Sequence, residues 1–385
     1  MVVGGCLIYL DHAATTPIDQ SVRMRMDEVN NSFFANPSSI HSLGQKSKVL
    51  IEQSRKIVAE TIGGKAGEIV FTSGGTESNN LAIIGAAKAN RKNGDHIITS
   101  RIEHPAVLKT CNYLAENGFR ISYIDIDNKG KLDLAQLEET ICNKTILISL
   151  MMVNNETGYL LPIKEVGELL KDRQIIFHSD AIQALDKIDF SVDELRIDML
   201  SLSSHKIYGP KGCGALYIRQ GTLIESILFG GSQEAHRRPG TENITAIAGF
   251  AEALGQMHHY QNNRRRIRSL GNLFEKRLKD IIPNLKINGE NLPRVPGYSN
   301  IYFPFMSGES ILMNLDLQGI AVSTGSACSS GSQKPSHVLQ AMGFTKDLIN
   351  NSVRFSLGRD TTKEEILRTI DVLKSIYDLS LKKLA

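Results

Sequence analysis

The chain has 385 residues, of which 41% are hydrophobic and 22% charged, and its formal net charge is +3. This length favours two subdomains, and the composition is that of an ordinary soluble globular protein. The charge is too small and too dispersed to favour nucleic-acid binding, and no apolar run approaches the roughly 20 residues that span a membrane. The five cysteines are scattered without a C-x-x-C pair, which argues against a disulfide framework or a cysteine metal site and favours the reducing cytoplasm.

Short apolar runs alternate with helical patterns between about residues 45 and 220. This alternation predicts an α/β fold with a mostly parallel central sheet and helices on both faces, in which ligands bind at the carboxyl ends of the strands. We expect strands at 68–71, 96–99, 119–124, 146–151, 175–177, 199–202 and 215–218, and helices at 76–89, 106–117, 134–141 and 163–171.

The C-terminal part predicts a smaller α+β domain. A long amphipathic helix is expected at 245–268 and a second helix around 273–281, followed by strands near 299–303 and 353–356 and a final helix at 363–379. We place the large domain at 16–256 and the small domain at 1–15 and 257–385.

A glycine-rich turn follows the first strand of the alternating region. Its small residues expose backbone N–H groups at a helix start, where the helix dipole favours an anion. Gly75 and Thr76 are therefore candidates for a phosphate cradle, although helix capping by Thr72 or Ser73 explains the same residues. The nucleotide-binding pattern G-x-x-x-x-G-K-[ST] is absent.

Two further strand ends carry polar residues whose role the pattern alone leaves open. His104 precedes a proline at a helix start and is either a structural histidine or a group that stacks on a planar cofactor and transfers protons. Asn155 either donates to a cofactor oxygen or forms an Asx turn.

Lys206 and Asp180 make the most informative pair. Each follows an apolar strand-like run, and a glycine-rich turn comes directly after the lysine. Pyridoxal 5′-phosphate chemistry needs a lysine that forms a Schiff base and an aspartate that keeps the pyridine nitrogen protonated. Around this pair, Gln183 is placed to bond the phenolate oxygen of the ring, and Ser203 and His205 to bond the phosphate.

Two residues of the C-terminal part carry further chemistry. Cys328 lies in a run of Ser, Gly and Ala without apolar periodicity, which predicts an exposed thiol on a mobile loop at about 324–334, a candidate nucleophile or carrier. Arg354 lies on an apolar strand, where it needs a partner. That partner is either a substrate carboxylate or an internal salt bridge.

Together these residues resemble the NifS/IscS-type cysteine desulfurases, of the class V branch of the fold-type I pyridoxal-phosphate enzymes. The similarity runs nearly end to end in the order of the family, and it rests on the joint match more than on any single piece. The matching stretches are 9–17, 36–39, 72–79, 103–104, 154–156, Asp180 with Gln183, 203–212, 238–243, 323–328 and 354–359. Ala35 stands where the family usually has glycine, and Ser232 interrupts a glycine-rich run after Gly230 and Gly231; both departures lie in loops.

The resemblance implies a homodimer that converts L-cysteine to L-alanine and keeps the sulfur as a persulfide on Cys328. Lys206, Cys328 and His104 are then the catalytic residues, and Asn36, Asn155 and Arg354 hold the substrate carboxylate. Thr241 reaches the phosphate of the other subunit. The residues implied to bind pyridoxal phosphate are Gly75, Thr76, His104, Asn155, Asp180, Gln183, Ser203, His205, Lys206 and Thr241.

The family passes its sulfur to an acceptor protein for iron–sulfur cluster assembly, tRNA thiolation or another sulfur modification, and the sequence does not select among these. A selenocysteine lyase and a non-catalytic sulfur-relay scaffold remain alternatives. A class V aminotransferase would have no use for Cys328, and the absence of G-x-G-x-x-G after the first strand counts against a dinucleotide-binding oxidoreductase.

Overall fold

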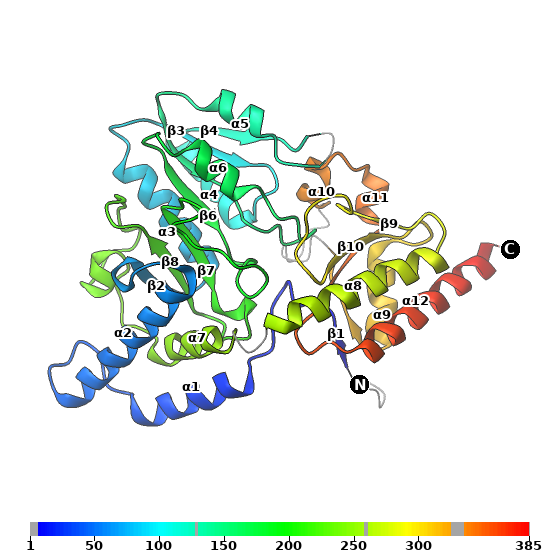
Figure 1. Cartoon of the computed structure of the whole chain (residues 1–385), viewed down its shortest axis with the longest axis horizontal. Helices are drawn as coiled ribbons and strands as arrows, with labels where there is room; N and C mark the ends of the chain where they lie inside the picture. Colours follow the sequence, from blue (N-terminus) through cyan, green and yellow to red (C-terminus); the bar gives the residue numbers. More distant parts are fainter. Residues whose placement is uncertain (1–6, 128–129, 258–260, 325–334, 385) are drawn as a thin grey trace.

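The computed structural model describes residues 7–127, 130–257, 261–324 and 335–384. It contains a seven-stranded sheet with helices on both faces and, beside it, a smaller part built around a second sheet (Figure 1). In the large sheet, β8 runs antiparallel to its two neighbours and every other pair is parallel. The strand order is β2 (Ile69–Thr72), β8 (Gly214–Ile218), β7 (Met199–Ser203), β6 (Ile176–Asp180), β5 (Thr145–Ser149), β3 (His96–Ser100) and β4 (Arg120–Ile124).

Consecutive residues of these strands pack against different helix layers, because side chains of a strand alternate between its two faces. Ile97 and Met199 pack with α3 (Gly75–Ala89) and α4 (Pro105–Glu116), whereas Ile98 and Leu200 pack with α2 (Ser42–Ile62), α6 (Ile163–Leu169) and α7 (Ile244–Gln256). The strands are therefore buried on both faces, which explains their continuous apolar sequence.

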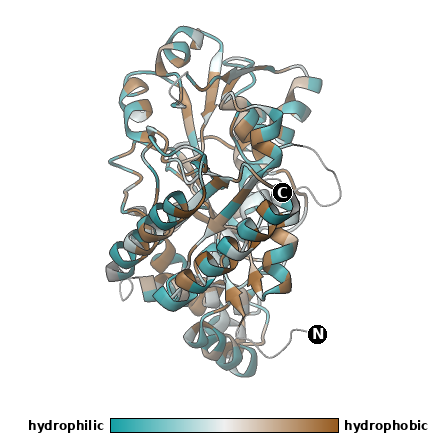
Figure 2. Ribbon diagram, turned by 90° about the vertical axis from the view of Figure 1, so that its right-hand side faces the viewer, coloured by the Kyte–Doolittle hydropathy of each residue, from teal (hydrophilic) through white to brown (hydrophobic). Residues whose placement is uncertain are grey.

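Outside this layer, α1 (Gln20–Ser32) packs on α7, and α5 (Leu134–Thr140) lies beside β4. Figure 2 shows that the long helices carry both hydrophilic and hydrophobic residues.

The smaller part has its own hydrophobic core. Its three-stranded antiparallel sheet has the order β12 (Ser352–Ser356), β10 (Tyr298–Tyr302) and β9 (Lys286–Ile287). Near the start of the chain, β1 (Ile8–Tyr9) pairs in parallel with β11 (Ile320–Ala321), so that Ile8 and Leu10 join this core. The helices of this part are α8 (Gln261–Ile281), α9 (Gly308–Leu317), α10 (His337–Ala341), α11 (Lys346–Asn350) and α12 (Lys363–Leu384).

The predicted fold class is confirmed, but one predicted element is wrong. The helix expected at 245–268 is two helices, since α7 ends at Gln256 and α8 begins at Gln261 and continues through the second predicted helix. The physical reason is a change of packing partner: α7 packs on α1 and α2, whereas α8 packs on α12 and β10. The proposed domain boundaries remain a prediction. Among the helices of the described residues, none is long and apolar enough to cross a membrane.

Candidate active site

Most of the predicted site residues meet at one edge of the large sheet. Asp180 is the last residue of β6, and Lys206 follows the end of β7 by three residues, in the short 3-10 helix Ser204–Lys206. Gly75 and Thr76 begin α3 directly after the turn that follows β2. These strands all run in the same direction, so their carboxyl ends lie together, as expected for a ligand site in an α/β sheet.

Lys206 and Gln183 point toward the same backbone oxygen. The Lys206 Nζ donates to the carbonyl oxygens of Ala13 at 2.6 Å and of Ala14 at 2.7 Å, and the Gln183 Nε2 donates to Ala13 O at 2.9 Å. The Gln183 Oε1 accepts a hydrogen bond from the Tyr298 hydroxyl at 2.5 Å. The N-terminal segment therefore crosses the site and links the lysine of the large sheet to the smaller part of the molecule.

Asp180 is buried, with 4% of its surface exposed. Its Oδ2 accepts from the Asn79 Nδ2 at 2.7 Å and its Oδ1 from the Ile182 N–H at 3.0 Å. Burial raises the pKa of this carboxyl, while the nearby His104 and Lys206 oppose the rise. A desolvated carboxylate of this kind gains stabilisation from a cation, and a protonated pyridine nitrogen is such a cation.

The two ring nitrogens of His104 have different roles: one accepts a backbone hydrogen bond, and the other carries the proton of the neutral ring. It is the N-cap residue of α4, and its Nδ1 accepts from the Ala106 N–H at 3.1 Å. A neutral ring in this position carries its proton on Nε2. Burial lowers the pKa of His104, the charges of Lys206 and His337 lower it further, and Asp180 opposes them. The ring is therefore neutral at pH 7 and can donate a hydrogen bond from Nε2.

The start of α3 has the features of a phosphate cradle. Its N-cap residue, Gly74, has no side chain to satisfy the N–H groups of the first turn. A Cβ on Gly75 would lie 2.0 Å from the Cδ1 of Ile182, so only glycine fits between this turn and the segment after β6. On the other side, the Ser203 Oγ is buried without a hydrogen-bond partner among the described residues. An unpaired hydroxyl beside unpaired N–H groups fits an anion such as the phosphate of pyridoxal phosphate.

His205 faces this region from the 3-10 helix after β7. Its Nδ1 lies 3.1 Å from the Thr15 Oγ1. Burial, followed by the charges of Lys206 and Lys211, lowers its pKa to about 4. The ring is therefore neutral at pH 7 and can offer a hydrogen bond, but no positive charge, to a bound anion.

Arg354 is the largest fully buried side chain in the described part of the chain, with 1% of its surface exposed. Its Nη2 forms an ion pair with the Asp11 Oδ1 at 2.8 Å, and its Nη1 donates to the backbone oxygen of Asn155 at 2.9 Å. The Nε has no hydrogen-bond partner among the described residues. The internal salt bridge that the sequence left open is therefore present, and the Nε–H of the guanidinium remains for a further acceptor.

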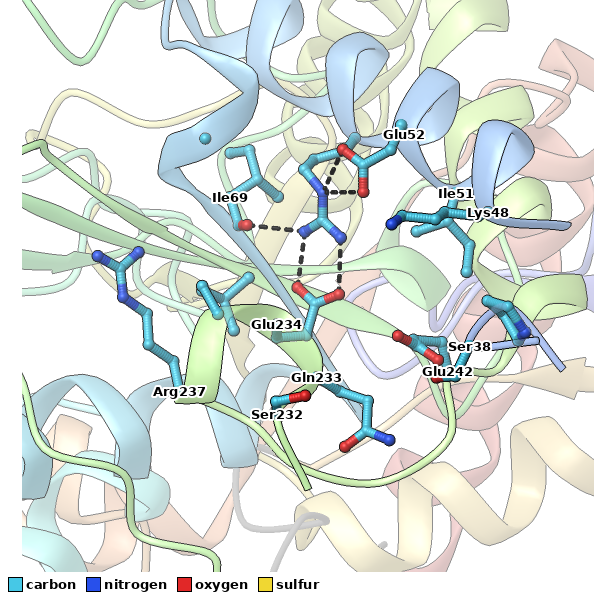
Figure 3. A pocket seen from close by; sticks show the side chains of 15 residues that line it. Ser38, Lys48, Ile51, Glu52, Ile69, Ser232, Gln233, Glu234, Arg237 and Glu242 are labelled. Carbon is cyan, nitrogen blue, oxygen red and sulfur yellow. Dashed lines mark hydrogen bonds and ion pairs between the residues drawn. The ribbon is translucent and has the colours of Figure 1, made fainter. Parts of the chain in front are cut away.

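Two predicted residues lie away from this edge. Asn36 is exposed in the connection between α1 and α2, where its Oδ1 accepts from the Ser38 N–H at 2.9 Å, and Thr241 is exposed shortly before α7. Their neighbours in the chain, Ser38 and Glu242, line a surface cavity of about 410 Å³ (Figure 3). Asn36 and Thr241 thus belong to the surroundings of this cavity, and Cys328 lies outside the described residues.

Several residues at the site were not predicted from the sequence. Asn79 binds Asp180 from one helical turn after Gly75, a spacing that could have identified it. Glu103 is buried beside His104, and burial raises its pKa to about 8. Glu156 is also buried and accepts from the Ser336 hydroxyl at 2.5 Å. The sequence pattern marks its neighbour Asn155 as the candidate site residue, because a glutamate in a polar stretch gives no sign that its side chain is buried.

Comparisons with known proteins agree with this architecture. The family model described as aminotransferase class-V matches residues 8–369. A protein named cysteine desulfurase IscS from Dictyoglomus turgidum is 46% identical over 96% of this chain and 94% of its own length. A solved NifS-like protein superposes with a TM-score of 0.91 at 32% identity over 97% of this chain and 100% of that one. A structure titled SspA in complex with cysteine gives 0.81 at 36% identity over 92% and 100%, respectively.

Proposed function

The chain belongs to the class-V aminotransferase family and is a pyridoxal-phosphate-dependent cysteine desulfurase, and we propose how its residues divide the work of the reaction. The observation that carries this proposal is the buried Asp180 at the end of β6, beside Lys206 and His104. When bound, the cofactor supplies a ring that withdraws electrons from the bonds at the α-carbon of the substrate.

The large sheet holds the cofactor. Lys206 carries it through its amine, and Asp180 keeps the pyridine nitrogen protonated, because a buried carboxylate favours a neighbouring cation. Gln183 has a second amide hydrogen beyond the one given to Ala13, and we assign it to the phenolate oxygen. The first turn of α3 at Gly75 and Thr76, together with Ser203 and His205, holds the phosphate.

The substrate is L-cysteine, and its carboxylate lies between Asn155 and Arg354. We assign this carboxylate to the Nε of Arg354, which has no hydrogen-bond partner among the described residues, and the ion pair with Asp11 keeps the guanidinium in one orientation. His104 donates a hydrogen bond from Nε2, where its tautomer places the proton. This arrangement orients the substrate before the sulfur is transferred.

The Cys328 thiolate takes the sulfur. It attacks the sulfur of the substrate, so that a sulfur–sulfur bond forms and the carbon–sulfur bond breaks. The electron pair of the broken bond stays with the carbon, which takes a proton and leaves as alanine, and Cys328 keeps a persulfide. An acceptor protein then removes the sulfane sulfur. Because the attack needs Cys328 as a free thiol, and the reducing cytoplasm keeps thiols free, we place the protein in the cytoplasm.

The protein works as a homodimer with shared active sites. Three large apolar side chains that lie within a few residues of the cavity lining in the sequence are exposed, namely Phe34 at 73%, Ile40 at 94% and Phe229 at 93%. Exposed apolar side chains of this size are typical of a protein interface. A second copy covering these side chains would receive Thr241 at its cofactor phosphate, and Asn36 would reach its substrate.

The experiment that tests this function is a visible spectrum of the purified protein before and after L-cysteine is added, with alanine and sulfide assayed in the same tube. We expect a yellow protein whose band shifts as alanine appears. Cys328→Ser should keep the colour and lose sulfide release, whereas Cys142→Ser, at the opposite edge of the sheet, should match the wild type. A colourless protein that cannot take up pyridoxal phosphate would contradict the function, and full activity of Cys328→Ser would contradict the persulfide role.

A further inference from the structure

Residues 230–243, which we call the arm, lead from the end of the large sheet into α7 and have an unusual backbone. Glu234, Ala235 and His236 follow one another with φ angles of 48°, 54° and 64°. Residues other than glycine rarely adopt the left-handed region, and three in succession are held there only when their surroundings impose it. The arm therefore has one fixed shape that other contacts maintain.

A buried ion pair provides those contacts. Two guanidinium nitrogens of Arg55, on α2, donate to the two carboxylate oxygens of Glu234 at 2.6 and 2.7 Å, as Figure 3 shows. The Phe71 N–H, on β2, donates to the same carboxylate at 2.8 Å. The two side chains are only 11% and 2% exposed. A bidentate ion pair fixes the orientation of the two side chains as well as their separation, so it holds the arm against the large sheet.

The locked arm presents Arg238 to the start of α3. The Arg238 Nε lies 2.8 Å from the Glu77 Oε1, and the other carboxylate oxygen of Glu77 accepts from the Ser73 N–H at 2.8 Å. Glu77 is in the first turn of α3, directly after Thr76. Both side chains are partly shielded from solvent, at 24% and 14% exposure, so their charges are less screened than on an open surface.

A carboxylate in this position works against phosphate binding. The N-terminus of α3 attracts anions, but Glu77 already places a negative charge in its first turn. Burial alone would raise the pKa of Glu77, yet hydrogen bonds from Arg238 and Ser73 hold it below its usual range, so the side chain stays ionised. Without a compensating cation, a phosphate dianion beside Thr76 would meet this charge at short range.

We propose that Arg238 is a positioning residue for the cofactor phosphate: it neutralises Glu77 and thereby lets the start of α3 accept a dianion. The inference rests on the proposed cofactor site and deepens it. Arg238 acts through Glu77 and not by touching the cofactor, and the Arg55–Glu234 pair holds the arm that delivers it. A positive charge that is far from the phosphate cradle in the sequence thus sets the affinity of the cradle for the cofactor phosphate.

The test is a double-mutant cycle of Arg238→Gln, Glu77→Gln and both together. Apoprotein is titrated with pyridoxal 5′-phosphate, and loading is followed by visible absorbance, with circular dichroism to check folding. We expect Arg238→Gln to weaken loading about tenfold, the size of one partly buried charge interaction. Glu77→Gln should bind as well as the wild type or better, and the double variant should recover most of the loss, because no charge then remains to be neutralised.

Two controls make the outcome specific. Arg237→Gln removes the neighbouring positive charge of the same arm and should leave loading unchanged. Pyridoxal without its phosphate should bind the wild type and Arg238→Gln equally. A double variant as weak as Arg238→Gln, or an equal loss with pyridoxal, would show a merely structural role and overturn the inference. If the wild type itself takes up no cofactor, the proposed function fails instead.

Discussion

Glu103 shows how a single side chain can carry a proton that its sequence context does not reveal. Its Oε1 accepts from the Ser100 hydroxyl at 2.5 Å and from the Met151 N–H at 3.0 Å, while its Oε2 is buried without a partner among the described residues. Burial raises the pKa to about 8, against 4.5 for an exposed glutamate. The folded protein therefore keeps this carboxyl protonated at pH 7, directly beside His104.

This residue gives the chain a pH dependence that glutamine removes. Between pH 4.5 and 8 the folded state holds the proton of Glu103 and the unfolded state does not, so the contribution of Glu103 to the free energy of unfolding falls as pH rises. Glu103→Gln stays neutral at every pH. We therefore expect its melting temperature, relative to the wild type, to increase from pH 5 to pH 8. The corresponding difference in the free energy of unfolding changes by at most about 1.4 kcal/mol per pH unit.

Thermal unfolding followed by circular dichroism at pH 5, 6, 7 and 8 measures this difference. Glu139→Gln, at an exposed glutamate on α5, serves as the control, and its melting temperature relative to the wild type should not change with pH. A Glu103→Gln difference that stays constant or shrinks toward pH 8 would mean that Glu103 is ionised in the folded protein.

At the scale of elements, the phosphate cradle depends on how closely α3 approaches the segment after β6. A Cβ at position 75 would lie 2.0 Å from the Cδ1 and 2.9 Å from the Cγ1 of Ile182. Gly75→Ala should therefore push the first turn of α3 away from Asp180, with a cost of about 1–3 kcal/mol that is typical of overpacking. We expect weaker pyridoxal-phosphate loading and a lower melting temperature.

The companion variant separates crowding from other effects of the extra methyl group. Gly75→Ala combined with Ile182→Ala removes the clashing atoms and should restore much of the loading. Gly67→Ala, where an added Cβ meets nothing within 4 Å, should change neither quantity. If Gly75→Ala alone loads like the wild type, the close approach does not shape the cradle.

Elements that depend on local periodicity were predictable, and those that depend on distant contacts were not. The strand ends that carry Asp180 and Lys206 follow from short apolar runs, because a parallel sheet buried on both faces needs continuous hydrophobic sequence. The break between α7 and α8 was missed, since helical periodicity does not reveal that the two helices pack on different cores. The Arg55–Glu234 pair joins residues 179 apart in the sequence, and no local pattern points to it.

At the scale of the whole molecule, the site residues implied by the family resemblance fall into two groups. Lys206, Asp180 and His104 lie together at one edge of the large sheet, whereas Asn36 and Thr241 are exposed around the cavity of Figure 3. A motif match assigns roles to residues but not to subunits. The separation within one chain is therefore expected if the second group serves the site of a partner.

Mixed dimers test this division directly. One subunit carries Lys206→Ala and keeps Thr241, and the other carries Thr241→Ala and keeps Lys206. If Thr241 acts across the interface, the mixed dimer has one complete site, because the intact Lys206 of one subunit meets the intact Thr241 of the other. Co-expressed with different affinity tags and purified over both, it should bind one pyridoxal phosphate per dimer with the affinity of the wild type. It should release alanine at about half the rate of the wild-type dimer.

Parallel samples of each variant alone should show no Schiff base for Lys206→Ala and weakened loading for Thr241→Ala. If Thr241 instead serves its own subunit, the only lysine-bearing site of the mixed dimer lacks its threonine, and loading stays as weak as in Thr241→Ala alone. A monomer in solution at micromolar concentration would exclude the shared site altogether.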